Sequence, residues 1–238
     1  MHRLNSDSYN DRLFSRGLRA RLHLARFHWA QRISREIPHN SVLELGCFDG
    51  RLLDYIRPSR YVGLDAGWEG GIDLAIARHA GDDTRQFIKA DDPTILKSLP
   101  SRSFDLGVAL ETLEHLPSDK LDLYLAEVAR LCDHFLVTVP NEKGPVFLAK
   151  WLVKRIALRD DDAHRYTVVE VLNATLGRMH LVRRDEHKGF DYAALATKLS
   201  ERFDVLSVVG LPLGPPLLAF SVGLIAKTRH PTSQSLAA

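Results

Sequence analysis

The stretch "SVLELGCFDG", residues 41–50, decides the fold of this chain. Its apolar first half is typical of a buried strand, and Glu44, Gly46 and Gly50 mark a sharp turn where that strand ends. Glycines let the backbone turn tightly and approach a ligand closely, as in the nucleotide-binding turns of open α/β sheets. The dinucleotide pattern G-x-G-x-x-G is incomplete, because Phe48 and Arg51 stand at its second and third glycine positions. The turn therefore favours a nucleotide-type site and weakens the case for NAD.

The rest of the chain repeats this alternation of apolar strands and helical patterns. Strand-like runs occur at 60–65, 85–91, 104–110 and 134–140, and helical patterns at 11–36, 50–57, 73–79 and 118–132. Strands separated by helices predict right-handed crossovers and a mainly parallel sheet covered on both faces. Residues 205–226 carry no charge over a length that could span a bilayer, but glycines and prolines interrupt them. We therefore expect two buried strands joined by a turn there.

Composition and charge are those of an ordinary globular protein. The chain has 238 residues, 45% of them apolar and 26% charged, and a net charge of +2, so no general attraction to polyanions is indicated. Residues 1–40 are basic, with eight Arg against Asp7, Asp11 and Glu36. Only Cys47 and Cys132 occur, and no secretory segment is visible. We therefore expect a cytoplasmic protein without a disulfide framework.

Two further strands end in a carboxylate. Asp65 closes the run at 60–65, where it could accept hydrogen bonds from both hydroxyls of a ribose, and Asp91 closes the run at 85–91, where it suits the edge of an adenine. Taken singly, an aspartate after a strand is as often a helix cap, and a glycine there is as often just a tight turn. The ordered set of Glu44, Gly46, Asp65 and Asp91 is the stronger indication of a cofactor site.

In this order, the segments resemble the class I S-adenosylmethionine-dependent methyltransferases. "ELGCFDG" resembles their first motif, "YVGLDA" the acidic segment after it, "IKADD" the second motif and "FDLGVALETLEHL" the third. The resemblance implies a Rossmann-like α/β fold with a seven-stranded, mostly parallel sheet whose last strand is antiparallel. It also implies S-adenosyl-L-methionine as cofactor, with Glu44 and Gly46 at the methionine end, Asp65 at the ribose and Asp91 at the adenine. The implied cofactor site is completed by Cys47, Gly50, Asp92 and Glu111. Phe48 departs from the pattern, since many relatives carry glycine there.

The resemblance covers residues 40–142 and 187–227 and sets the expected organisation of the chain. We expect a basic amphipathic cap helix within 1–39, the cofactor-binding core at 40–142 and a helical insertion or lid at 143–186. The insertion has helical patterns at 145–158 and 167–176. The last part of the sheet, preceded by a helix at 191–202, then occupies 187–227. The polar tail 228–238 is expected to be disordered.

The segment "ETLEH", residues 111–115, has two interpretations. In the first, Glu111 ends a strand, Glu114 favours a helix start and His115 packs locally. In the second, it resembles the E-x-x-E-H metal motif of ubiquinone-biosynthesis O-methyltransferases and of small-RNA 2′-O-methyltransferases, which add a later histidine. His187 stands in that place, so the resemblance implies a divalent cation (Mg²⁺, Mn²⁺ or Zn²⁺) on Glu111, Glu114, His115 and His187. Such an ion would ease deprotonation of an acceptor hydroxyl.

The acceptor is the least determined part of the prediction. We expect O-methylation of a small or lipid-linked molecule, such as a sugar, a quinone precursor or a polyketide-like ring. Without a metal, His115 or His187 would be the catalytic base, with His164 a weaker candidate and nitrogen acceptors open. The amphipathic segment 144–159 suits peripheral membrane contact, a lid, or a helix docked on the core. The low net charge argues against an RNA substrate, and a non-catalytic scaffold is the remaining alternative.

Overall fold

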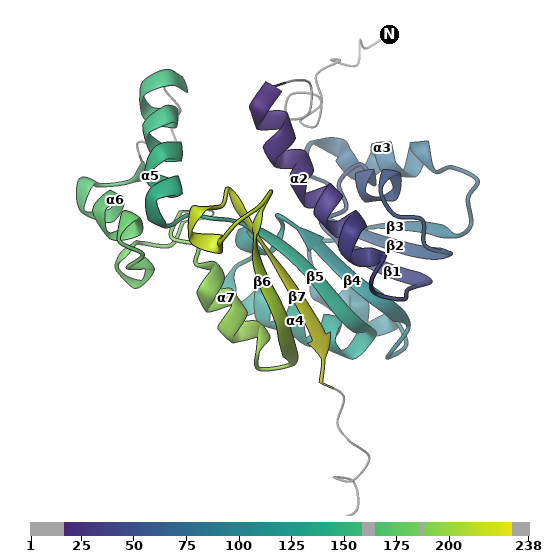
Figure 1. The fold of residues 1–238 in the computed structure, drawn as a ribbon. Coiled ribbons are helices and arrows are strands. Elements are labelled where there is room, and N and C mark those ends of the chain that lie inside the picture. Colours follow the sequence, from purple (N-terminus) through teal and green to yellow (C-terminus); the bar gives the residue numbers. More distant parts are fainter. Residues whose placement is uncertain (1–16, 159–164, 186–187, 230–238) are drawn as a thin grey trace, which may run out of the picture.

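The structure is a computed structural model that describes residues 17–158, 165–185 and 188–229 (Figure 1). Its centre is a seven-stranded sheet with the order β3-β2-β1-β4-β5-β7-β6. The strands are β1 (Ser41–Leu45), β2 (Arg60–Asp65), β3 (Arg85–Lys89), β4 (Phe104–Leu110), β5 (Cys132–Pro140), β6 (Phe203–Leu211) and β7 (Ser221–Thr228). Strands β1 to β5 are parallel, whereas β7 runs antiparallel to both β5 and β6. The predicted fold class and strand topology are confirmed.

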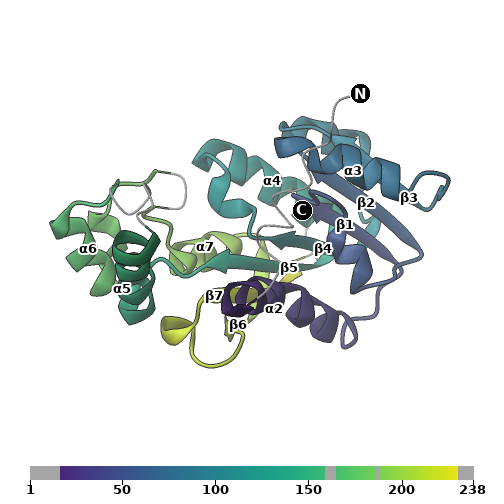
Figure 2. The ribbon, with the colours of Figure 1, turned by 90° about the horizontal axis from the view of Figure 1, so that it is seen from above.

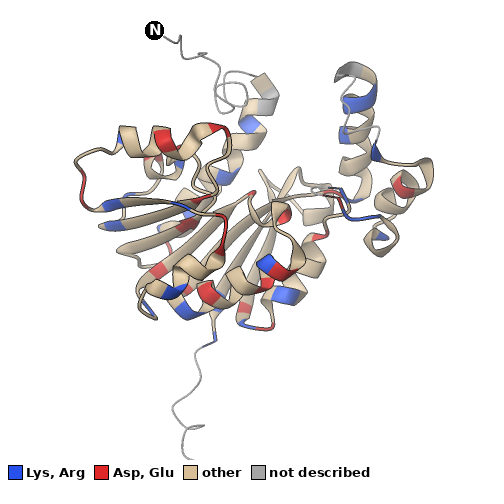
Figure 3. Cartoon of the chain, turned by 180° about the vertical axis from the view of Figure 1, so that it is seen from behind, with Lys and Arg blue, Asp and Glu red and all other residues tan. Residues whose placement is uncertain are grey.

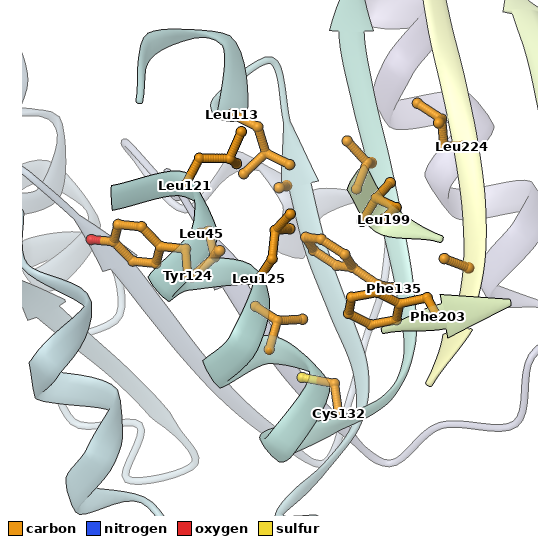
Figure 4. Close-up of a cluster of buried hydrophobic side chains, with 14 of the residues drawn as sticks. Leu45, Leu113, Leu121, Tyr124, Leu125, Cys132, Phe135, Leu199, Phe203 and Leu224 are labelled. Carbon is orange, nitrogen blue, oxygen red and sulfur yellow. The ribbon is translucent and has the colours of Figure 1, made fainter. Parts of the chain in front are cut away.

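Helices cover both faces of the sheet because the strands are apolar on both sides. On one face, α2 (Gly17–Ser34) and α3 (Gly71–Arg78) bury Trp29, Ile33 and Ile72 against β1 and β4. On the other face, α4 (Ser118–Leu131) and α7 (Tyr192–Leu199) bury Leu125, Leu199 and their neighbours against Phe135 and Phe203 (Figure 4). The carboxyl ends of β1, β2, β3 and β4 consequently meet at one edge of the sheet.

A small helical unit follows β5. It consists of α5 (Gly144–Val153), which continues as a π-helical turn at Lys154–Leu158, and α6 (Val168–Thr175). Phe147, Val171, Ala174 and Met179 form its own small core. Figures 1 and 2 show α5 and α6 on the side of the sheet where β6 and β7 lie, and α5 contacts the loop that joins these two strands.

Three local expectations can be compared with these elements. The pattern at 50–57 is not an α-helix but a short 3₁₀ turn, Arg51–Asp54, since Gly50 has φ 71° and Pro58 disfavours helical backbone at the residue before it. The uncharged stretch 205–226 forms β6 and β7, as expected. None of the helices in the described residues is long and apolar enough to cross a bilayer. Of the predicted tail 228–238, Thr228 still belongs to β7, and residues 230–238 lie outside the described residues.

The buried face of α2 also differs from the expected one. The spacing of Leu22, Ala25 and Trp29 predicts these residues as the apolar face, but Leu22 and Ala25 are only half-buried. Arg26 is buried instead, with 9% of its surface exposed. A guanidinium is rarely buried without an ionic partner. The packing of α2 on the sheet therefore depends on a carboxylate that pairs with Arg26.

Candidate functional site

The loop after β1 is held in an unusual backbone conformation. Gly46 and Gly50 both have φ 71°, and Phe48 between them has φ 45°, a left-handed value that non-glycine residues rarely adopt. A Cβ atom on Gly46 would lie 2.2 Å from Thr112 Oγ1, so only glycine fits there. The Phe48 ring packs on Gly71, where a Cβ would lie 2.3 Å from the ring. The loop therefore keeps the turn expected of a cofactor cradle although phenylalanine replaces the usual glycine.

Glu44 and Cys47 lie beneath this loop. Glu44 is 2% exposed and accepts a hydrogen bond from the Tyr61 hydroxyl. Burial raises the pKa of Glu44 to about 8. Cys47 is buried against Gly63 and the Tyr61 hydroxyl, and burial raises the pKa of its thiol. Cys47 can therefore reach a cofactor only through its backbone, whereas Glu44 places a proton-carrying group under the loop.

Asp65 links the loop to the end of β2. Its Oδ2 accepts a hydrogen bond of 2.9 Å from the Phe48 amide, and its Oδ1 one of 2.7 Å from the Gly67 amide. Each carboxylate oxygen can accept more than one hydrogen bond, so ribose hydroxyls can still be bound. The bent loop, Asp65 and the buried Glu44 thus fit the nucleoside and methionine ends of S-adenosylmethionine.

The two aspartates after β3 differ in surroundings. The Asp91 side chain is exposed and lies 3.7 Å from Lys120 Nζ, so it is accessible at the rim of the site. Asp92 caps the 3₁₀ turn Pro93–Ser98, because its Oδ1 accepts a hydrogen bond of 2.8 Å from the Thr94 amide. Asp92 therefore has a structural role as a cap, whether or not it also contacts the cofactor.

Glu111, at the end of β4, forms the centre of a polar network. Its carboxylate pairs with Arg26 from α2 and accepts a hydrogen bond of 2.8 Å from the Ser221 hydroxyl at the start of β7. His23 Nδ1 lies 3.7 Å away. Burial alone would raise the pKa of Glu111, but the Arg26 guanidinium holds this pKa well below its ordinary range. Glu111 is thus ionised and joins three elements that are distant in sequence.

Glu114 is the most deeply buried carboxyl of the site. It is 1% exposed and, apart from its own backbone amide, its two oxygens have no hydrogen-bond partner in the described part of the chain. Burial, reinforced by the charge of Glu111, raises its pKa well above the ordinary value. Arg184 donates a hydrogen bond to the Glu114 backbone carbonyl. Glu114 is therefore shifted towards its neutral form beside an ionised Glu111.

The structure describes three of the four residues of the expected metal motif, Glu111, Glu114 and His115. Arg26 already neutralises Glu111, and a second cation beside that guanidinium would be repelled. His115 is exposed on the 3₁₀ turn Leu113–His115, and His187 and His164 lie outside the described residues. Across residues 17–158, 165–185 and 188–229, no three His, Cys, Asp or Glu side chains gather to hold an ion. The described residues therefore form no metal-ligand set, and the fourth expected ligand, His187, is not among them.

Sequence reasoning missed the partners that organise the site. Arg26 is one basic residue among many in the N-terminal region, and Ser221 lies 110 positions after Glu111. Thr112, whose hydroxyl donates to the Leu45 carbonyl at 3.2 Å, closes the loop of β1 against the end of β4. The sequence signal that could have pointed to Arg26 was His23, which lies three residues before Arg26 and therefore on the same face of the helix.

Comparison with known proteins agrees with this geometry. Residues 43–134 match the family model of a methyltransferase domain. An S-adenosylmethionine-dependent methyltransferase from Clostridium acetobutylicum superposes with a TM-score of 0.58 at 12% identity, covering 93% of this chain and 96% of that one. The N-methyltransferase NodS from Bradyrhizobium japonicum, solved with S-adenosylhomocysteine, superposes with a TM-score of 0.56 at 16% identity, covering 96% and 94%.

A third solved structure shares the same fold. The methyltransferase domain of bacterial CtHen1 superposes with a TM-score of 0.58 at 14% identity, covering 87% of this chain and 99% of that one. At such low sequence identities, these structures establish the fold of this chain but do not identify its acceptor. No curated protein matches the sequence.

Proposed function

We propose that this chain, whose residues 43–134 match a methyltransferase domain, uses S-adenosylmethionine to methylate a hydroxyl group of a small or lipid-linked acceptor without a divalent metal. The observation that carries the metal-independent part is the ion pair between Arg26 and Glu111. It occupies the carboxylate that the metal motif would need, and burial raises the pKa of the neighbouring Glu114 carboxyl well above its ordinary value. The acceptor class is the one expected from the sequence.

The bound cofactor supplies a methyl group on a sulfonium, which any well-aligned nucleophile can accept. The chain must hold the cofactor, position the acceptor oxygen and remove its proton. Glu44, the Gly46 loop and Asp65 hold the cofactor. We assign proton removal to His115, which follows the end of β4 and whose imidazole can serve as a general base. The proton moves from the acceptor oxygen to the imidazole as the oxygen–methyl bond forms and the carbon–sulfur bond breaks.

The metal question is tested by calorimetry on the chelator-treated protein saturated with S-adenosylhomocysteine. We expect no saturable heat when Mn²⁺ is titrated into the parent. A saturable heat in the parent that disappears in Glu114→Ala and His187→Ala would establish a metal site and overturn the metal-independent mechanism.

The reaction itself is tested with methyl-labelled cofactor and pairs of ring acceptors that differ only in presenting a hydroxyl or an amine. We expect label on the hydroxyl members, and a His115→Gln variant that loses turnover but still binds S-adenosylhomocysteine. Label on the amines alone would move the assignment to nitrogen. A parent that fails to bind S-adenosylhomocysteine would instead indicate a scaffold without catalysis.

A further inference from the structure

The surface of α2 that faces away from the sheet is basic throughout. Residues Gly17–Ser34 contain no acidic side chain. Arg21, His28 and Arg32 are exposed and spaced by seven and four positions, so they line one side of the helix. Within the described chain, neither Arg21 nor Arg32 has a carboxylate within ion-pair distance. These are positive charges that the protein does not use internally.

A groove beside these charges leads to the loop between β6 and β7. It has a volume of about 340 Å³ and is lined by Arg21, Ala25, His28, Trp29, Arg32 and Pro212. Its lining therefore combines three apolar side chains (Ala25, Trp29 and Pro212) with three basic ones (Arg21, His28 and Arg32). Pro212 opens the loop, so the basic stripe of α2 and the loop form one continuous surface.

The same loop presents leucines to solvent. Leu213 is 79% exposed, Leu218 59% and Leu217 48%, although apolar side chains of this size are normally buried. The loop is also firmly held. The buried amide of Asn141 donates hydrogen bonds of 3.0 Å and 2.9 Å to the carbonyls of Pro216 and Ala219. Its leucines are thus exposed by an ordered loop, which is typical of a binding surface rather than of local fraying.

Neighbouring elements extend the apolar part. Gly144, the first residue of α5, lies against Leu217, and α5 with its π-helical turn exposes Val153 at 54% and Ile156 at 73%. Figures 1 and 2 place α2, the loop and α5 on the same side of the molecule. On the opposite side, Figure 3 shows acidic and basic residues interspersed over the helices.

We propose that this surface, formed by Arg21, His28, Arg32, Leu213, Leu217 and Leu218, docks on an anionic lipid bilayer. Cations beside protruding leucines match the negative headgroups and the acyl boundary of such a bilayer. The surface adjoins the site, since Ser221 follows the loop and bonds to Glu111. A docked molecule would therefore hold its active site close to the bilayer. The inference concerns binding alone and is independent of which acceptor is methylated.

Co-sedimentation with vesicles tests the proposal on the full chain. We expect the parent to bind vesicles that contain phosphatidylglycerol, to bind pure phosphatidylcholine weakly, and to be released by high salt. Arg21→Glu/Arg32→Glu should weaken binding at least about 25-fold, since each lost arginine charge is worth roughly five-fold near an anionic surface. Leu213→Ser/Leu218→Ser should also weaken binding to these vesicles, but it should change the salt dependence of binding less than Arg21→Glu/Arg32→Glu does.

A matched control comes from the opposite face. Lys97→Glu/Leu123→Ser alters one exposed cation and one exposed leucine there, and should leave vesicle binding unchanged. All variants should bind S-adenosylhomocysteine like the parent, which shows that they are folded. Absence of sedimentation by the parent, or equal loss in the control, would overturn the proposal. Binding of a short RNA duplex, but not of vesicles, through the same arginines would show that the surface serves nucleic acid instead.

Discussion

At the scale of single residues, the site depends on which carboxyls carry a proton. Glu44, Glu111 and Glu114 all lie near the Arg26 guanidinium, yet only Glu111 forms an ion pair with it. One cation can neutralise one carboxylate, and burial makes a second unpaired negative charge costly. The positively charged cofactor would supply the missing cation for Glu44 when it binds.

The protonation of Glu44 predicts a pH dependence of stability. Its pKa is about 8 in the fold against an ordinary value of 4.5, so between these values the unfolded chain is ionised while the folded chain keeps the proton. This group's stabilisation is therefore complete below pH 4.5 and is lost as the pH rises to about 8. Over that range Glu44→Gln should gain roughly 3–5 kcal/mol in unfolding free energy relative to the parent. Urea unfolding at several pH values measures this, and the exposed Glu36→Gln should follow the parent.

Asp65 gives a second prediction at this scale. Asp65→Ala removes the acceptor of the Phe48 and Gly67 amides and the acceptor proposed for the ribose. We expect affinity for S-adenosylhomocysteine to fall at least about tenfold, since hydrogen bonds to a charged acceptor contribute about 1.5–3 kcal/mol. Calorimetric titration measures this, with the exposed Asp83→Ala as control. Unchanged affinity in Asp65→Ala would show that the ribose lies elsewhere.

At the scale of elements, the ion pair between Arg26 and Glu111 fixes α2 on the sheet. It joins a helix near the start of the chain to the end of β4, and Ser221 adds the start of β7. Glu111 itself has φ 53°, a left-handed value, and its amide donates to the Thr138 carbonyl at 2.8 Å. The backbone after β4 is therefore held in an uncommon conformation that aims this carboxylate at α2.

Removing either partner of this pair alone should be costly, because it leaves the other charge unpaired. Arg26→Met leaves the largely buried Glu111 carboxylate without its cation and is expected to lose about 3–5 kcal/mol of unfolding free energy. Arg26→Met/Glu111→Gln removes both charges and should recover more than half of that loss. Denaturant unfolding of both single variants and the double variant gives the coupling energy. Additive losses would mean that the two side chains do not act as a pair.

At the scale of the whole molecule, the candidate cofactor site links the two halves of the sheet. The site takes Glu44 and Asp65 from the first strands and is closed by Glu111, which is tied to β7. Any ligand that binds only the folded state adds stability in proportion to the logarithm of its concentration. We expect saturating S-adenosylhomocysteine to raise the thermal midpoint, with a gain of about 2.7 kcal/mol at a hundredfold excess over Kd. Asp65→Ala should lose most of this gain, whereas Asp83→Ala should keep it.

Much of the architecture could be predicted from the sequence because the relevant information is local. Apolar runs such as 104–110 and the turn at Gly46 and Gly50 determine strands and strand ends through side-chain pattern and backbone sterics alone. The expected helix at 50–57 failed for a local reason as well, since the left-handed Gly50 and Pro58 leave too few residues for a stable helix.

The chemistry of the site was decided by the tertiary structure. The segment "ETLEH" predicts two carboxylates and an imidazole near one another, but it does not say which cation faces them. Arg26 reaches Glu111 across 85 positions of sequence and Ser221 across 110, and pairings over such distances are set by packing. The sequence by itself determined the sheet and the sharp turn after β1, and it predicted the class of cofactor. Only the packing of α2 and β7 against the end of β4 determined that Glu111 is paired with arginine and that Glu114 is buried.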